Sequence, residues 1–232
     1  MKPIEPEVDL CAALRQQTGA GTFEAHVSVD AAPPAECERF RALCAELGVK
    51  CVLIELPEGQ TRSQSMTASY HHGSLADVAE EVAALSRRIR AAGFPIRRVK
   101  LEAVATNDGV PDTDAQAALF PPSNYFEFHV KLLLTATADL ARLGELCARH
   151  DAHLSRNALK RDAAGRSERF ATLRVYRAGR QRAFAHFDAF LADLEAAGYV
   201  FTNKLREYAI YDTAVALDAG WIDVPESGDE HA

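Results

Sequence analysis

The chain has 232 residues and a formal net charge of −7, and 48% of its residues are hydrophobic. This is the composition of a globular protein with a packed core, and it excludes a low-complexity chain. No apolar run approaches the roughly 18 residues that span a bilayer, and the N-terminal residues lack the order of a secretion signal. We therefore expect a cytoplasmic protein with no membrane partner. Five cysteines without a CxxC pair fit reduced thiols rather than disulfides or a zinc site.

The first 106 residues predict a helical lead-in followed by one compact module. Residues 1–21 contain a short helix from Val8 to Gln17. In the module, alternating apolar and polar residues predict strands, and apolar residues at helical spacing predict helices. For residues 22–106 these patterns give strand Phe23–Val29, a helix between Pro33 and Gly48, strand Val49–Leu56, strand Ser63–His71, a helix between Ser74 and Gly93, and strand Ile96–Val104. Ser74 and Asp77 resemble a helix-capping pair.

Residues 124–213 predict the same order of elements. They give strand Phe126–Leu134, helix Asp139–His150, strands near Leu154–Leu159 and Phe170–Tyr176, helix Gln181–Ala197 and strand Val200–Tyr211. Residues 107–123 contain Asn-Asp-Gly and Pro-Pro and are a linker by composition. Residues 214–232 form a C-terminal extension, in which Trp221 packs back on the body before an acidic tail.

The two modules also share sequence at a fixed spacing. Residues 23–27 are FEAHV and residues 126–130 are FEFHV, and each histidine precedes a cysteine by eighteen residues. Each module then has an Ala-Ala-Gly-aromatic sequence whose glycine precedes a glutamate by nine residues, Glu102 or Glu207. This repetition predicts an internal duplication. We expect an α+β fold of two tandem ferredoxin-like (βαββαβ) modules whose sheets face each other across a central cleft.

The strand periodicity predicts which side chains enter the cleft. Helices cover one face of each sheet, so the polar phase of each strand belongs on the open face. The side chains predicted to face the cleft are Glu24, His26, Ser28, Ser65, Thr67, Ser69, His71, Lys100, Glu102, Glu127, His129, Lys131, Thr172, Arg174 and Tyr176. Glu207 shares the phase of Leu205 and Ala209, which argues against a place in the cleft.

Two histidines on equivalent strands suggest proton exchange on opposite sides of a ligand, because imidazole titrates near neutral pH. His26-Val27-Ser28 and the duplicated layout resemble the 2H phosphoesterase superfamily, which carries one His-x-Ser/Thr motif in each lobe. The resemblance implies that His26 and His129 are catalytic in a metal-independent phosphoesterase or phosphoryl- or nucleotidyl-transfer enzyme without a cofactor. Lys131 stands where the second motif has a hydroxyl residue.

The ligand of such a site is expected to be a small anion, with phosphate as the leading candidate. Each module is near neutral, with the acidic excess in the remaining segments, so we expect no binding of duplex nucleic acid. Guanidinium and ammonium groups bind phosphate well. The predicted ligand-binding residues are Glu24, Ser28, His71, Lys100, Glu102, Glu127, Lys131, Arg156, Lys160 and Arg174.

Two other interpretations fit the same residues. His26, Glu102, His129 and Glu207 are the two-histidine, two-carboxylate set of vicinal-oxygen-chelate enzymes, whose βαβββ module lacks the second helix predicted here. Alternatively, the paired histidines and glutamates bond to each other in a non-catalytic ligand-binding or scaffold protein. The sequence does not identify the substrate or the oligomeric state.

Overall fold

The computed structural model describes residues 10–15, 17–30, 34–59, 61–135, 138–157 and 167–222. Within these ranges the chain runs twice through the order βαββαβ. The first run comprises β1 (Ala20–Val29), α2 (Pro34–Leu47), β2 (Lys50–Glu55), β3 (Ser63–Ser74), α3 (Leu75–Ala91) and β4 (Ile96–Val104). The second comprises β5 (Tyr125–Leu134), α5 (Leu140–Ala148), β6 (Ala152–Asn157), β7 (Ser167–Tyr176), α6 (Arg180–Ala196) and β8 (Phe201–Asp212). The expected α+β class is confirmed.

Three short elements complete the described chain. They are α1 (Leu10–Ala13) before the first run, α4 (Asp114–Ala117) between the runs, and the 3₁₀ turn η1 (Val215–Asp218) after β8. The predicted lead-in helix is therefore shorter than Val8–Gln17 among the described residues. The predicted acidic tail from Pro225 onward, the last two residues of the predicted packing segment 214–224, and the predicted ligand residue Lys160 lie outside the described residues.

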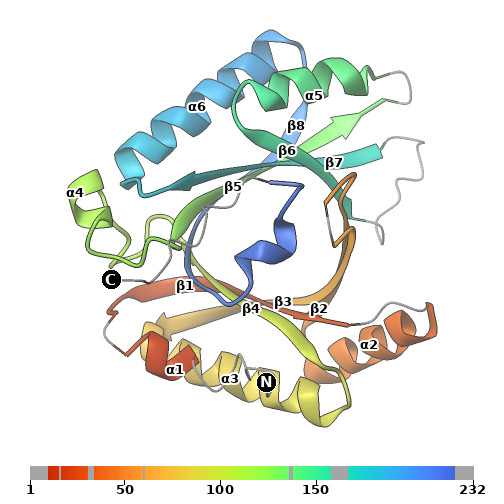
Figure 1. Cartoon of the computed structure of the whole chain (residues 1–232), viewed down its shortest axis with the longest axis vertical. Coiled ribbons are helices and arrows are strands. Elements are labelled where there is room, and N and C mark those ends of the chain that lie inside the picture. The colour runs from red at the N-terminus through yellow and green to blue at the C-terminus, as the bar shows by residue number, and fades with distance from the viewer. Residues whose placement is uncertain are drawn as a thin grey trace.

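All eight strands belong to one antiparallel sheet that closes on itself as a barrel (Figure 1). Each run contributes the ferredoxin-like strand order, β4-β1-β3-β2 and β8-β5-β7-β6. The sheets do not face each other as two separate layers, because β4 pairs with β8 and β2 pairs with β6. Unpaired edge strands expose backbone N–H and C=O groups, and these two pairings satisfy all four edges.

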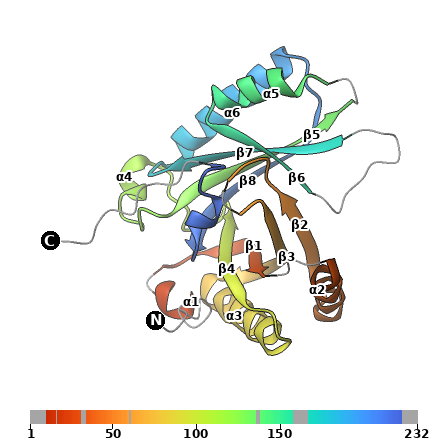
Figure 2. The same ribbon diagram turned by 45° about the vertical axis from the view of Figure 1, so that its right-hand side comes forward.

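The helices lie outside the barrel, where they cover the apolar face of each strand. Figure 1 places α5 and α6 on one side of the barrel and α1, α2 and α3 on the opposite side, and Figure 2 shows the same arrangement from another direction. Helix α3 is capped as the sequence predicted, since the Ser74 hydroxyl accepts a hydrogen bond from the Asp77 N–H at 3.2 Å. No helix among the described residues is long and apolar enough to cross a membrane.

The shared Ala-Ala-Gly-aromatic sequences end the two long helices in the same way. Gly93 and Gly198 have φ values of 87° and 82°, which only glycine adopts without strain. The following aromatic N–H then bonds back to the last turn, Phe94 to Ile89 at 3.3 Å and Tyr199 to Leu194 at 3.0 Å. This is the Schellman ending of a helix, and it returns the chain toward the sheet.

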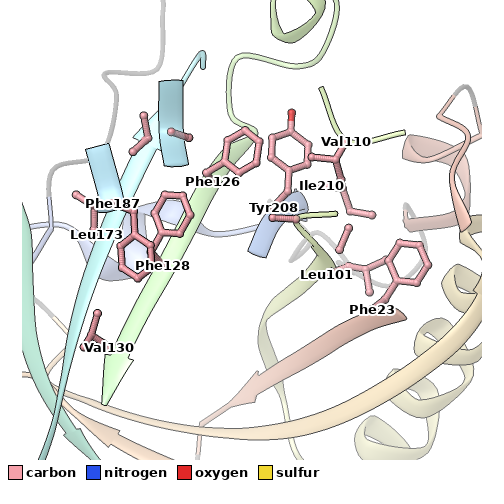
Figure 3. Packing of buried hydrophobic residues seen from close by; sticks show 14 of the residues in the cluster. Phe23, Leu101, Val110, Phe126, Phe128, Val130, Leu173, Phe187, Tyr208 and Ile210 are labelled. Atoms are coloured by element: carbon pink, nitrogen blue, oxygen red, sulfur yellow. The ribbon is translucent and has the colours of Figure 1, made fainter. Parts of the chain in front are cut away.

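The main core lies between the barrel and its helices and is continuous across both runs. Phe23 and Leu101 from the first run belong to the same buried cluster as Phe126 and Tyr208 from the second (Figure 3). Phe128 stacks on Phe187 of α6, with ring centroids 4.5 Å apart. Because one cluster spans the β4–β8 pairing, the two runs form one folding unit rather than two independent domains.

The predicted orientation of β3 is wrong. Met66 and Ala68 line the barrel interior, whereas Thr67 and Ser69 point the other way, toward the helices. His71 follows Ser69 and hydrogen-bonds Glu81 of α3 at 2.7 Å, outside the barrel. The error arises because the interior of this barrel accepts apolar side chains on its β2–β3 side, so the polar phase does not identify the inner face.

The segment after β8 folds back across the barrel. In Figure 1 this segment lies between the two halves of the sheet. Trp221 packs with Leu56 and Ile222 in a small separate cluster, and its indole N–H donates to the Leu154 carbonyl at 3.0 Å. The expectation that Trp221 packs on the body is confirmed.

Replacing Phe187 by alanine tests the core. Phe187 is fully buried and stacked on Phe128, so we expect the Phe187→Ala variant to lose about 3–5 kcal/mol of unfolding free energy in urea denaturation. The matched control is Leu119→Ala, whose side chain is 85% exposed, with an expected change within about 0.5 kcal/mol. Equal changes in the two variants would contradict the assigned core.

Candidate functional site: an ionisable cavity inside the barrel

The barrel encloses a cavity of about 190 Å³ with two chemically different walls. The apolar wall consists of Val52, Ile54, Leu56, Met66, Ala68, Phe170, Leu205 and Trp221. The ionisable lining residues are Glu24, His26, Lys50, Arg98, Lys100, Glu102, Glu127, His129, Arg174, Glu207 and Asp218. Such a cavity suits a small ligand with an apolar body and at least one polar group.

Strand alternation places the two predicted histidines in this cavity. On β1, Phe23, Ala25 and Val27 are buried in the core, so Glu24 and His26 face inward. On β5, Glu127 and His129 face inward in the same way. Both histidine side chains are partly accessible, 19% for His26 and 26% for His129.

Glu207 also enters the cavity, contrary to the prediction from its strand phase. On β8 the apolar Leu205 faces inward together with Glu207. The alternate residue Arg206 faces the helices, where its guanidinium lies 4.5 Å from the Phe184 ring centre and donates to Asp188 at 2.6 Å. A cation over an aromatic face packs well under a helix, and this contact reverses the usual polar and apolar phases.

The sheet register brings equivalent residues together in each run. Glu24 is the Cα partner of Glu102 across β1 and β4, and Glu127 is the partner of Glu207 across β5 and β8. The residues opposite the histidines differ, because Lys100 lies opposite His26 whereas Leu205 lies opposite His129. The site is therefore nearly symmetric in its carboxyls and imidazoles but not in its cations.

Seven side chains form a closed series of contacts, which we call the ionisable ring. Its members are Lys100, Glu102, His26, Glu24, Glu207, His129 and Glu127. Lys100 Nζ joins the two runs, since it lies 2.7 Å from a Glu102 oxygen and also contacts Glu127. Glu102 and Glu127 thus share one buried cation.

The ring continues through the two imidazoles to a pair of carboxyls. His26 Nε2 lies 3.4 Å from Glu102 and 3.7 Å from Glu24. His129 Nε2 lies 3.4 Å from Glu127 and 4.0 Å from Glu207. The ring closes between Glu24 and Glu207, which lie close enough for the Glu207 carboxyl to act on the pKa of Glu24 and for the charge of Glu24 to raise the pKa of Glu207.

Neighbouring threonines fix the orientation of both imidazoles. His26 Nδ1 lies 3.1 Å from the Thr67 carbonyl oxygen, so Nδ1 carries the proton and Nε2 faces the carboxyls. The carbonyl is available because the Thr67 hydroxyl, rather than the carbonyl, accepts the Val27 N–H at 3.1 Å. In the second run His129 Nδ1 contacts the Thr172 hydroxyl at 3.0 Å.

The ring carboxyls have opposite protonation preferences. For Glu207, burial and then the charges of Glu102 and Glu24 raise the pKa well above its ordinary value. For Glu127, burial acts in the same direction, but Arg174 and Lys100 outweigh it and hold the pKa well below the ordinary value. Burial also opposes ionisation of Glu24, and the charge of His26 is the main factor that nevertheless lowers its pKa.

The same carboxylates favour a charged His26. Burial disfavours the imidazolium, but contact with Glu102 and the charge of Glu24 outweigh burial and raise the pKa of His26. The raised pKa values of His26 and Glu207 favour proton donors on this wall of the cavity, whereas the lowered pKa of Glu24 favours a proton acceptor.

A second buried network adjoins the ring and contains two arginines. Arg98 donates to Asp212 at 2.8 Å and to Asp218 at 2.9 Å, and Arg174 donates to Glu127 at 2.6 Å and to Asp218 at 2.7 Å. Burial opposes ionisation of Asp218, yet Arg98 and Arg174 lower its pKa to about 2. All three buried cations of the cavity, Arg98, Lys100 and Arg174, therefore already have carboxylate partners.

The structure brings together most, but not all, of the predicted site residues. Glu24, His26, Ser28, Lys100, Glu102, Glu127, His129 and Arg174 line the cavity. Three predicted ligand residues lie elsewhere: Lys131 pairs with Glu168 at 2.5 Å, His71 pairs with Glu81, and Arg156 pairs with Glu55. Each of these three side chains contacts a glutamate that does not line the cavity.

Sequence reasoning missed Arg98, Asp218 and the carboxyl pair. Arg98 shares the phase of Lys100 on β4, so the signal was present. Asp218 follows the last predicted strand, and no local pattern indicates that this segment returns to the barrel. The pairing of Glu24 with Glu207 depends on barrel closure, which periodicity does not reveal.

The described residues do not support the two-histidine, two-carboxylate metal set. No group of three or more histidine, cysteine, aspartate or glutamate side chains within the described ranges is arranged to hold a metal ion. Lys100 Nζ sits against Glu102, one of the four proposed ligands, and contributes a positive charge there.

Comparisons with known proteins do not assign this chain to a family. No family model matches it, and no curated protein matches it at a significant level. One solved structure, described provisionally as a chlorite dismutase, is 14% identical over 82% of this chain and 95% of that chain, with a TM-score of 0.25. A likeness of that size carries no argument about activity.

The raised pKa of His26 predicts a pH-dependent contribution to stability. A histidine whose folded pKa exceeds its unfolded value of about 6.5 contributes stability that is fully present below that pH and is lost as pH rises through the folded pKa. We expect the stability advantage of the wild type over His26→Gln to shrink over this range in urea denaturation. The exposed His72→Gln variant is the control, and parallel profiles for both variants would contradict the assignment.

The raised pKa of Glu207 predicts that the stability of the Glu207→Gln variant relative to wild type increases with pH. Its folded pKa is raised well above 4.5, so the folded wild type loses stability as pH rises from that value through the folded pKa. Glu207→Gln removes this loss, and we expect its stability relative to wild type to grow over the same range. Glu46→Gln, at an exposed position, should show no such trend, and a flat difference for Glu207→Gln would contradict a protonated Glu207.

Proposed function

We propose that this chain is a small-molecule enzyme that binds its substrate in the barrel cavity and catalyses a reaction by general acid–base chemistry. The observation that carries the proposal is the Glu24–Glu207 pair, in which neighbouring carboxyls have pKa values shifted in opposite directions. Two titratable groups whose pKa values are shifted apart in this way supply a proton donor and a proton acceptor at one pH. Glu207 is the donor and Glu24 the acceptor.

The histidines support this pair from both sides. His26 Nε2 lies 3.7 Å from Glu24, and His129 Nε2 lies 4.0 Å from Glu207. Each carboxyl therefore has an imidazole through which a proton can be exchanged with the solvent-accessible part of the cavity. This retains the predicted proton-exchange role of His26 and His129 and adds the carboxyls as the groups nearest the substrate.

The anionic substrate expected from the sequence receives less support. Arg98, Lys100 and Arg174 each contact carboxylates, and Lys131 and Arg156 pair with glutamates away from the cavity lining. A phosphate would have to displace one of these carboxylates before it paired with a buried cation, although the exposed Lys50 also lines the cavity. The resemblance to the 2H phosphoesterases stays a prediction, and so does phosphoesterase activity.

We also infer that the two βαββαβ runs derive from a duplication. The shared strand order, the matching carboxyl registers and the equivalent helix endings support a common origin. A catalytic pair formed by one carboxyl from each run fits this origin, because symmetry brings equivalent strands β1 and β5 near the same cavity.

A ligand screen followed by turnover tests the function. Compounds that raise the melting temperature of the wild type are incubated with enzyme and analysed for conversion by mass spectrometry. We expect at least one to be converted, and Glu207→Gln to lower kcat by about 10²–10⁴-fold, the usual contribution of a general acid. His129→Gln should also lower kcat.

The matched control for this screen is Asp188→Ala, which removes an exposed carboxylate from Arg206 without touching the cavity. Its kcat should equal that of the wild type. Ligands that bind without conversion, with equal affinity for wild type and Glu207→Gln, would contradict the enzymatic proposal and favour the non-catalytic binding protein.

A further inference from the structure

The ionisable ring has a lysine between Glu102 and Glu127 but an uncharged residue at the equivalent position between Glu24 and Glu207. Lys100 bridges Glu102 of the first run and Glu127 of the second. The equivalent bridge would join Glu207 of the second run and Glu24 of the first, because Glu102 and Glu207 hold equivalent register positions, as do Glu24 and Glu127. The residue at the register position of Lys100 is Leu205, which has no charge.

The consequence is visible in how Glu24 and Glu207 interact. Glu102 and Glu127 share an ammonium group, whereas the neighbouring Glu24 and Glu207 carboxyls repel each other, and the charge of Glu24 helps to raise the pKa of Glu207. Glu207 is 5% exposed, and its ion-pair contact among the described residues is with His129 at 4.0 Å rather than with a lysine or arginine. Buried carboxylates without a cation are costly, so this pair favours any positive group that reaches it.

The excess of carboxyl groups over buried cations on the ionisable wall also favours a cationic ligand group. Six buried carboxyl groups, those of Glu24, Glu102, Glu127, Glu207, Asp212 and Asp218, surround only three buried cations in the described part of the chain. The raised pKa values of Glu207 and His26 favour protons on these two groups, which offset part of the remaining negative charge. A cationic ligand group would replace a proton here rather than compete with an existing ion pair.

Two further features indicate that a ligand, rather than the protein alone, completes the site. The Ser28 hydroxyl lines the cavity, is 3% exposed and has no hydrogen-bond partner within the described residues. Buried hydroxyls are normally bonded, so a partner group is expected there. Ser28 lies four residues beyond Glu24 on β1, a separation of about 13 Å between Cα atoms at the rise of a strand. The apolar wall faces the space between them.

From these observations we propose that the cavity binds a primary ammonium group of its ligand between Glu24 and Glu207, in the position that Lys100 occupies between Glu102 and Glu127. The ligand is an elongated amine whose apolar body packs on Val52, Ile54, Met66 and Phe170, and whose far end carries a hydrogen-bonding group for Ser28. On binding, the ammonium keeps its three protons and Glu207 releases its proton to solvent. This proposal deepens the proposed function, on which it rests, by naming the substrate class, and it assigns proton donation in the amine-bound state to His26, because Glu207 is then ionised.

Matched six-carbon probes test the proposal in isothermal titration calorimetry at low salt. We expect n-hexylammonium to bind the wild type at least tenfold more tightly than 1-hexanol, and hexanoate and inorganic phosphate to bind more weakly than 1-hexanol. Titrations in buffers of different ionisation enthalpy should reveal up to one proton released for each ammonium bound. Tighter binding of hexanoate or phosphate than of hexylammonium would overturn the proposal and restore the anionic ligand.

Two variants locate the ammonium in the cavity. Leu205→Lys supplies the cation at the unmatched register position, and we expect it to weaken hexylammonium binding at least tenfold. Glu207→Gln, which keeps the size of the side chain, should weaken binding and abolish proton release even if the lysine variant does not fold. Asp188→Ala, the surface control, should bind as the wild type does. Wild-type affinity in both Leu205→Lys and Glu207→Gln would overturn the proposal.

The binding experiment separates this proposal from the enzymatic one. Ammonium binding at Glu207 without conversion of any ligand would contradict only the acid–base activity. Conversion of a ligand that has no amine, with no measurable hexylammonium binding, would contradict only the substrate class.

Discussion

The contact of Lys100 with Glu102 and Glu127 is the interaction on which the interior of this barrel depends. Glu102 belongs to the same strand as Lys100, whereas Glu127 belongs to the second run, so one ammonium group joins both halves of the molecule. Burial of charge is costly unless opposite charges and hydrogen bonds compensate it. Lys100 supplies that compensation on one side of the cavity, whereas on the other side Leu205 takes the equivalent register position and the pKa of Glu207 is raised.

Much of the scaffold was predictable from the sequence because local rules govern it. Alternation in residues 23–29 and 126–134 identified β1 and β5 together with their inward-facing glutamates and histidines. Glycine and capping residues gave the helix ends, as at Ser74 and Gly93. These features depend on neighbours within a few residues, so a single sequence contains the information.

The arrangement of the site depended on contacts that no local pattern encodes. Barrel closure through β4–β8 and β2–β6 places the site in a cavity inside one closed sheet, open to solvent on one side, rather than in a cleft between two sheets. The apolar lining from β2 and β3 reversed the expected orientation of β3 and excluded His71. Arg206 occupied a place under α6 that an apolar residue usually takes, so Glu207 faced inward. In each case a long-range contact overrode strand periodicity.

The partners of Arg98 have a consequence for how this protein is made. Arg98 lies on the last strand of the first run, but its carboxylates, Asp212 and Asp218, follow it by 114 and 120 residues. During translation the first run therefore emerges with a buried-site guanidinium that has no counter-ion and with β4 and β2 unpaired at their edges. A nascent chain of this kind is expected to rely on chaperones until the ribosome has completed Asp218, and to be an early target of quality-control proteases when synthesis stalls before that residue.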